Sequence, residues 1–188
     1  MRIIGGNLGG RKITPPSRMP HTRPTTDIAK EGLFNILQNN LPLQDIKTLD
    51  LFGGTGSISF ELASRGAGQQ IIVERDVKMC AFIRKTASAL AISNMSIVQG
   101  DVFKFLQQCQ DDFDFIFAGP PYALENIDAL AELVVAKHLL KPDGWFVLEH
   151  TPRNSYEQFP LFTAKRNYGT TVFSIFVNNL RMDKSQED

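Results

Sequence analysis

Between residues 46 and 149, short apolar runs alternate with segments in which apolar positions recur every three or four residues. The runs predict strands at 46–52, 70–73, 96–99, 113–117 and 145–149. The intervening periodicity predicts helices at 57–64, 77–90, 102–109 and 127–139. Because the runs are continuous rather than alternating, they favour a sheet covered on both faces. The strand–helix order therefore predicts an α/β fold, a doubly wound, mostly parallel sheet of Rossmann-like type.

The N-terminal segment has a different pattern. Residues 1–24 are rich in Gly, Pro and Arg, and two Gly-Gly pairs separate the β-prone pieces 2–4 and 11–13. We expect a small β-hairpin followed by a loop. A helix is predicted to begin near Thr26 or Asp27, either of which can cap it, because apolar residues then fall on one face.

The C-terminal segment also departs from the strand–helix alternation. Residues 163–168 and 171–178 flank Gly169 and predict a closing antiparallel hairpin. We therefore divide the chain into a basic N-terminal arm at 1–26, a single domain at 27–182 and a polar tail at 183–188.

Composition narrows the class of protein. The chain has 188 residues, of which 43% are hydrophobic and 21% charged, as in an ordinary soluble domain. No apolar run approaches the roughly 20 residues of a membrane span, and the start lacks an apolar signal core. Cys80 and Cys109 lack His or Cys neighbours, so we interpret them as reduced core thiols of a cytoplasmic protein that binds no metal. The role of His150, at a strand end, is left open.

Charge is unevenly distributed along the chain. The formal net charge is zero, yet residues 1–30 carry six basic groups and one acidic group. A basic arm on an acidic body is a possible phosphate-binding surface, although a solvated surface segment would have the same composition.

A glycine-rich turn follows the first predicted strand, where residues 49–57 read Leu-Asp-Leu-Phe-Gly-Gly-Thr-Gly-Ser. Glycines there let the backbone approach a ligand closely, at the end of the sheet where α/β folds bind ligands. The spacing of Gly53, Gly54 and Gly56 is tighter than in the dinucleotide fingerprint, and the Lys-Ser/Thr of a P-loop is absent. The carboxylate of Asp50 favours a ligand with an ammonium group. A turn without a ligand is the alternative.

Acidic residues follow the next two strands. Glu74 comes 20 residues after Gly54, where a carboxylate can accept both hydroxyls of a ribose. Asp101 follows the third strand, where it can accept the amino hydrogens of adenine while Val102 packs on the ring. Both acids could instead only stabilise the N-termini of the helices that follow.

The fourth strand ends in Phe117-Ala118-Gly119-Pro120-Pro121-Tyr122. The two prolines preset an extended backbone without N–H donors, so its carbonyls can face a substrate amine, and Tyr122 can stack on a flat base. A rigid turn with a core tyrosine is the alternative. A class I methyltransferase has this order of motifs: a glycine-rich turn, an acid after each of the next two strands, and Pro-Pro-Tyr after the fourth strand.

With these motifs, the chain resembles the RsmD family of bacterial 16S ribosomal RNA guanine-N2 methyltransferases over nearly its whole length. The residues that are similar to the distinctive start of that family are 2–6, 10–12, 22–27 and 33–37. Further matches are 49–52, 64–67, 142–144, 149–150 and 168–170.

The resemblance implies S-adenosylmethionine as cofactor and 16S ribosomal RNA, or the small ribosomal subunit, as partner of a monomer that needs no membrane. It implies cofactor contacts by Arg23, Thr25, Thr26, Asp50, Phe52, Gly53, Gly54, Gly56, Glu74, Asp101 and Val102. It implies that the catalytic segment, which positions a flipped guanine, is Gly119, Pro120, Pro121 and Tyr122. It implies RNA-phosphate contacts by Arg11, Lys12, Arg18 and Arg23.

One residue departs from the family pattern. The family has Asp, or Asn in related amino-methylating enzymes, directly before Pro-Pro-Tyr, and that side chain accepts a hydrogen bond from the target amine. This chain has Gly119. Losing such a contact costs several kcal/mol of barrier, so the rate could fall by about 10² or more. An altered sequence, a naturally weakened enzyme, or a site in which the Pro120 carbonyl suffices would each explain it. Our hypothesis is an intact cofactor site with impaired catalysis.

Three other functions compete with this interpretation. An amino-methyltransferase acting on another nucleic acid or on a protein glutamine is disfavoured by the family-like arm and the lack of a DNA-reading domain. A non-catalytic S-adenosylmethionine- or RNA-binding module is made plausible by Gly119. An NAD-dependent dehydrogenase would need a different glycine spacing and a substrate domain that this length does not hold.

Overall fold

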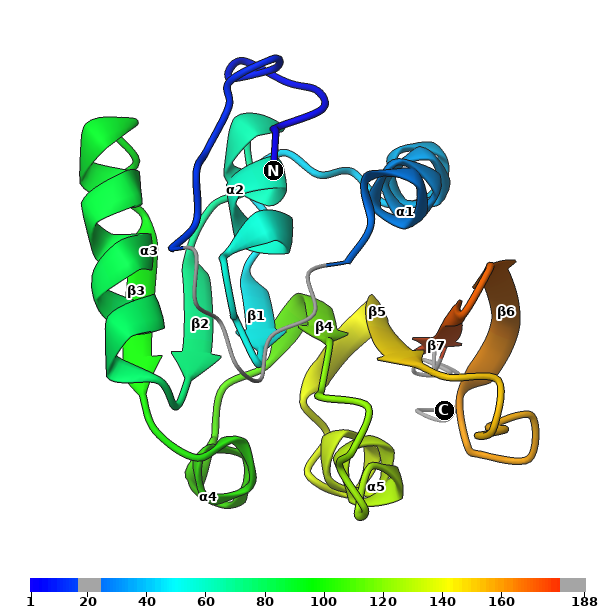
Figure 1. The fold of residues 1–188 in the computed structure, drawn as a ribbon. Helices are drawn as coiled ribbons and strands as arrows, with labels where there is room; N and C mark the ends of the chain where they lie inside the picture. The colour runs from blue at the N-terminus through cyan, green and yellow to red at the C-terminus, as the bar shows by residue number, and fades with distance from the viewer. Residues whose placement is uncertain (17–24, 180–188) are drawn as a thin grey trace, which may run out of the picture.

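A seven-stranded sheet forms the centre of the molecule in the computed structural model, which describes residues 1–16 and 25–179 (Figure 1). The strands are β1 (Thr48–Leu51), β2 (Gln70–Glu74), β3 (Met95–Gln99), β4 (Phe113–Ala118), β5 (Leu140–His150), β6 (Phe162–Tyr168) and β7 (Thr171–Val177). The helices are α1 (Asp27–Asn40), α2 (Ser57–Ser64), α3 (Val77–Ala89), α4 (Val102–Gln108) and α5 (Asp128–Ala136).

The strand order is β3-β2-β1-β4-β5-β7-β6. Strands β1 to β5 are mutually parallel, and β7 is antiparallel to both β5 and β6. The predicted doubly wound sheet with a closing antiparallel hairpin is therefore confirmed. Within that hairpin β7 takes the interior place. All seven of its residues are buried, whereas every residue of β6 is exposed or half-buried.

Helices cover both faces of the sheet. Helices α1, α2 and α3 lie on one face, and α4 and α5 lie on the other (Figure 1). The largest apolar cluster lies between the sheet and α4 and α5, and it includes Leu106, Leu130 and Phe146. A second cluster lies beneath α1 and α2 and includes Leu33 and Phe115. This two-sided burial is what the continuous apolar strands predicted.

Several boundaries differ from the predicted ones. β1 ends at Leu51, because Phe52 turns out of the strand with φ 65°. α5 ends at Ala136, three residues early, and His138 follows with φ 53°, which a helix does not allow. β5 begins at Leu140 instead of residue 145, because Leu140 pairs with Phe113 of β4 ahead of an irregularity in the register.

The predicted N-terminal hairpin is reduced to a single antiparallel bridge between Arg2 and Lys12. The Ile3 N–H donates to the Arg11 carbonyl at 3.0 Å. The segment does not extend into strands because it packs on α2 instead, where its residue Asn7 donates a backbone N–H to the Ser64 carbonyl at 2.7 Å.

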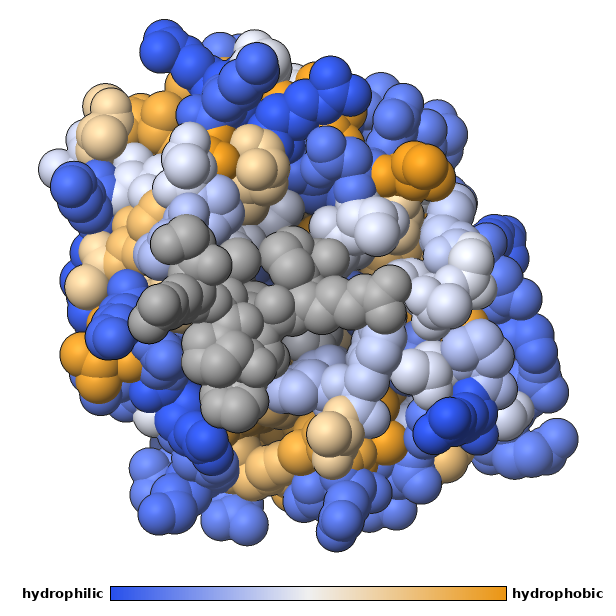
Figure 2. Space-filling view, in the orientation of Figure 1, coloured by the Kyte–Doolittle hydropathy of each residue, from blue (hydrophilic) through white to orange (hydrophobic). Residues whose placement is uncertain are grey.

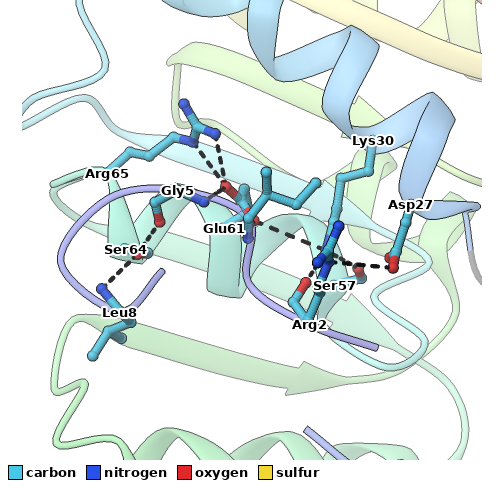
Figure 3. A network of polar contacts seen from close by, with 10 residues as sticks. Arg2, Gly5, Leu8, Asp27, Lys30, Ser57, Glu61, Ser64 and Arg65 are labelled. Carbon is cyan, nitrogen blue, oxygen red and sulfur yellow. Dashed lines mark hydrogen bonds and ion pairs between the residues drawn. The ribbon is translucent and has the colours of Figure 1, made fainter. Parts of the chain in front are cut away.

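A buried polar network holds this segment in place (Figure 3). The carboxylate of Glu61 on α2 accepts the backbone N–H groups of Ile4 and Gly5 at 2.7 and 2.9 Å. It also accepts the Arg65 guanidinium at 2.9 Å. The Lys30 ammonium lies 3.9 Å from Glu61, is 1% exposed, and donates to a backbone carbonyl and a hydroxyl. These charges are satisfied by the protein itself, as buried charges must be.

Other predictions concern single residues. Cys80 and Cys109 are free and buried, which confirms them as core thiols. His138 is exposed. His150 is buried, its ring nitrogens lie 2.8 Å from the Thr151 carbonyl and the Ser174 hydroxyl, and burial lowers its pKa. None of the helices in the described ranges is long and apolar enough to cross a membrane.

Candidate active site

A cleft of about 1130 Å³ lies at the carboxyl ends of the parallel strands. It is lined by most of the residues singled out in the sequence: Thr25, Asp50, Phe52, Gly53, Gly54, Glu74, Asp101, Val102, Gly119, Pro120, Pro121 and Tyr122. Four others do not line it, namely Thr26, Gly56, Arg11 and Lys12. Arg18 and Arg23 lie outside the described residues. Segments up to about 100 residues apart in the chain thus meet at one edge of the sheet.

The glycine turn packs closely against β2 and against side chains of α2 and α3. A Cβ on Gly53 would lie 2.4 Å from Cγ2 of Ile72, so only glycine fits there. Gly56 precedes α2 with φ +74°, which glycine adopts without strain. Phe52 adopts φ 65°, a strained conformation for this residue type and one that clusters at ligand sites. The glycines therefore let the turn pack tightly on the core where Phe52, Gly53 and Gly54 line the cleft.

Asp50 lies at the floor of the cleft with 3% of its surface exposed. The Ser59 hydroxyl donates to its carboxylate at 2.6 Å. Burial raises the pKa of Asp50 to about 7, against the lowering effect of the Ser59 hydrogen bond and with a further rise from the Glu74 charge. A cation bound nearby would favour the ionised form. This environment suits the ammonium-binding role that the sequence predicted.

Glu74 is fixed at the end of β2 by two backbone amides. The Gly54 N–H donates to one carboxylate oxygen and the Asp76 N–H to the other, both at 2.7 Å. Each oxygen keeps a second lone pair, so the carboxylate can still accept hydroxyl hydrogens. The N-cap of α3 is Asp76, not Glu74, because the Asp76 side chain accepts the N–H of Lys78 at 2.7 Å. Glu74 is therefore not the N-cap of α3.

Asp101 combines the two roles considered for it. It is the N-cap of α4, accepting the Lys104 N–H at 3.0 Å, and it lines the cleft. Val102 beside it is buried. Two apolar side chains missed in the sequence, Val77 and Phe103, also line this part of the cleft, and Val77 is 61% exposed. Exposed apolar surface next to two carboxylates suits a flat ring with amino and hydroxyl groups.

The Pro-Pro-Tyr segment forms the opposite side of the cleft. Tyr122 is 37% exposed, so it is not a core tyrosine. Its hydroxyl lies 3.2 Å from that of Thr171. The Gly119 backbone N–H donates to the Leu51 carbonyl at 3.3 Å, which ties the start of this segment to β1. The aromatic ring therefore lies at the mouth of the cleft, where a flat substrate can contact it.

Sequence reasoning assigned no role to Glu149, the acid at the carboxyl end of β5. It lines the cleft with 5% of its surface exposed. The Thr25 hydroxyl donates to it at 2.6 Å, and the Tyr122 hydroxyl donates at 3.5 Å. The signal that could have found it is the one that found Glu74, a carboxylate at the carboxyl end of a buried parallel strand. Within the described ranges, no group of three or more His, Cys, Asp or Glu residues is arranged to hold a metal ion.

The class I S-adenosylmethionine-dependent methyltransferases are defined by a mostly parallel sheet with a glycine turn after β1, an acid at the end of β2, an acid after β3 and a cleft across the carboxyl edge. The family described as "Conserved hypothetical protein 95" matches residues 1–177. The chain belongs to this family, the RsmD family.

Individual relatives agree with this assignment. Ribosomal RNA small subunit methyltransferase D of Escherichia coli is 33% identical over 149 residues, covering 79% of this chain and 71% of that protein. The structure of a hypothetical protein from Thermus thermophilus superimposes with a TM-score of 0.81 at 26% identity, over 94% of this chain and 98% of that one. A Thermus thermophilus 16S rRNA N2 G1207 methyltransferase, solved with AdoMet and guanosine, has a TM-score of 0.64 at 24% identity, over 82% and 44%.

Proposed function

We propose that this protein transfers a methyl group from S-adenosylmethionine to the exocyclic N2 amine of a guanine in 16S ribosomal RNA. The observation that carries the proposal is the single cleft in which Asp50, Glu74 and Asp101 face the glycine turn while Tyr122 borders the mouth. Its volume exceeds the roughly 300–1,000 Å³ of ordinary small-molecule sites, so it has room for a cofactor and a base together.

The three acids fit the polar groups of the cofactor. Asp50 would face the methionine ammonium, Glu74 the ribose hydroxyls, and Asp101 with Val102 the adenine. The bound cofactor supplies an electrophilic methyl group on a sulfonium. The protein has to hold the target amine in line with it, since positioning and electrostatic stabilisation dominate such reactions.

The substrate assignment rests on the relatives and on the surface. The similar Escherichia coli protein is named for the small-subunit RNA, and the Thermus thermophilus structure that shares the fold holds guanosine. Arg11 and Lys12 are exposed on the N-terminal segment and are available to RNA phosphates. Hydrophilic residues make up much of the outer part of the face in Figure 2, as suits a polar partner. We propose that the enzyme acts as a monomer in the cytoplasm.

In this proposal methyl transfer is slower than with Asp at position 119, because Gly119 has no side chain to accept a hydrogen bond from the target amine. A side chain there needs the Phe117 ring to shift by a few tenths of an ångström, because an added Cβ would lie 3.0 Å from the ring edge and 3.8 Å from Glu149. The variant Gly119→Asp should raise the single-turnover rate, by up to about 10² if no other group of the protein accepts a hydrogen bond from the amine. Gly119→Ala is the control for the displaced ring.

The proposal is tested by calorimetry with S-adenosylmethionine, followed by transfer of a labelled methyl group to small-subunit particles that lack the modification. Transfer to the N2 of one guanine, located by mass spectrometry of RNA fragments, supports it. Cofactor binding without transfer, in both the wild type and Gly119→Asp, favours the alternative of a non-catalytic binding module. Label on another base would reject the guanine-N2 assignment.

A further inference from the structure

The acid at the end of β5 lies beside the position where the family has its acid. In the parallel pair β4–β5, Ala118 is in register with Leu148, so Gly119 and Glu149 follow as the next neighbours. Paired residues of parallel strands project to the same side of the sheet. A Cβ built on Gly119 would lie 3.8 Å from Oε2 of Glu149. The Glu149 carboxylate therefore reaches the space that a side chain at position 119 would enter.

The Glu149 carboxylate is held in a defined orientation. The Thr25 hydroxyl donates to Oε2 at 2.6 Å, and the Tyr122 hydroxyl donates to Oε1 at 3.5 Å. Only 5% of the Glu149 surface is exposed, yet the residue lines the cleft together with Pro120 and Tyr122. A carboxylate has two oxygens with several lone pairs, so it can accept hydrogen bonds from the protein and from the N–H of a ligand at the same time.

We propose that Glu149 is a catalytic residue, the acceptor for the target amine in place of the acid that this chain lacks before Pro-Pro-Tyr. The inference rests on the proposed function of the cleft. One amine N–H donates to the Glu149 carboxylate, which directs the nitrogen lone pair toward the methyl carbon. It also places a negative charge beside the nitrogen as positive charge develops there.

The atoms and electrons of the step balance. The nitrogen lone pair forms the new bond to the methyl carbon, and the bond from that carbon to sulfur breaks with both electrons remaining on sulfur, which becomes a neutral thioether. The nitrogen now carries a positive charge and three substituents besides the ring. It loses one proton to Glu149, which returns it to water. The Pro120 carbonyl can accept a hydrogen bond but is too weak a base to take this proton, so it does not fill the same role.

The distinguishing experiment is a double-mutant cycle between positions 119 and 149, measured as single-turnover methyl transfer to unmodified small-subunit particles. Glu149→Gln in the full chain should lower the rate by about 10²–10³ while the Kd for S-adenosylmethionine stays within about threefold. Gly119→Asp should raise the wild-type rate by about tenfold at most, but should raise the Glu149→Gln rate by about 10². The cycle is then strongly non-additive.

Two controls separate chemistry from structure. Gly119→Ala in the Glu149→Gln background displaces the same ring without adding a carboxylate, and it should give no rescue. Glu132→Gln removes an exposed charge on α5, and it should leave the rate unchanged. Rescue by Asp but not by Ala cannot come from a purely structural role for Glu149.

Each outcome decides the proposal. A Glu149→Gln rate within threefold of the wild type, or equal Gly119→Asp gains in both backgrounds, overturns the role of Glu149 and leaves the proposed function standing. A wild type and a Gly119→Asp variant that both transfer nothing overturn the two proposals together. If Glu149→Gln does not fold, Gly119→Asp in the wild type decides alone, because a gain near 10² would show that Glu149 does not supply the acceptor.

Discussion

Two buried glutamates lie in different surroundings: Glu61 on α2 belongs to a buried ion-pair network, and Glu149 at the end of β5 lines the cleft. Their exposed fractions are nearly equal, 0% and 5%. Glu61 is surrounded by backbone amides and by the cations of Arg65 and Lys30, which come from the protein itself (Figure 3). Glu149 borders the cleft and receives hydroxyl donors from the arm and from the Pro-Pro-Tyr segment.

The comparison teaches that burial does not separate a structural acid from a functional one. What separates them is whether the carboxylate is enclosed by protein on all sides or lines a cleft that a ligand can enter. Glu61 faces packed protein between α2 and the N-terminal segment, so its charge can only stabilise the fold. Glu149 and Glu74 line a cleft large enough for ligands, and in our proposals part of their hydrogen-bonding capacity is directed at molecules that are not part of the fold.

The largest expected effect tests the structural half of this comparison. Glu61→Gln leaves the Lys30 ammonium, 1% exposed, without its counter-charge. Breaking a buried ion pair from one side costs about 3–5 kcal/mol, so the free energy of unfolding should fall by that amount in urea denaturation. Glu31→Gln, an exposed acid on α1, is the matched control and should change it by less than about 0.5 kcal/mol. A Glu61→Gln loss below about 1 kcal/mol would contradict the structural role.

The next largest effect is on the binding of S-adenosylmethionine and concerns Glu74, the last residue of β2. Glu74→Gln should weaken the binding of S-adenosylmethionine by about tenfold to a hundredfold, because hydrogen bonds to a charged group contribute about 1.5–3 kcal/mol. Isothermal titration calorimetry measures it, with Glu132→Gln as the control. An unchanged Kd would remove Glu74 from the cofactor site and leave it as a support for the glycine turn.

Asp50 is a third buried acid, and the pH dependence of protein stability tests how burial affects it. Burial raises its folded pKa to about 7, above its ordinary value of 3.8, so its contribution to stability is present below pH 4 and is lost as the pH rises through 7. The melting temperature of the wild type should therefore fall relative to Asp50→Asn between pH 4 and 7, and stay parallel to it above pH 8.

The ionisation of Asp50 should also make the affinity for S-adenosylmethionine depend on pH. Between pH 6 and 7.5 the ionised fraction of Asp50 rises severalfold, so the wild type should bind S-adenosylmethionine about fivefold more tightly at the upper value. Asp50→Asn should lack this gain. Parallel affinity curves for the two proteins would argue that Asp50 does not face the ammonium group.

The smallest effect concerns the link between the arm and the cleft. Thr25→Val keeps the shape of the side chain but removes the 2.6 Å hydrogen bond to Glu149. We expect the single-turnover rate to fall by about three- to tenfold, since a bond of this kind contributes about 1 kcal/mol. Thr14→Val, an exposed threonine of the N-terminal segment, should have no effect. An unchanged rate for Thr25→Val would mean that Glu149 keeps its orientation through its other contacts.

Local patterns in the sequence were enough to predict the parallel sheet, the five helices and the closing hairpin, because each depends on neighbours in the chain. The glycine turn, Glu74 and Asp101 could be placed at one edge because parallel strands present their carboxyl ends together. Strand order and register depend on contacts between distant segments. Only the tertiary structure therefore decided that β7 lies between β5 and β6, and that Glu149 stands beside Gly119, 30 residues earlier in the chain.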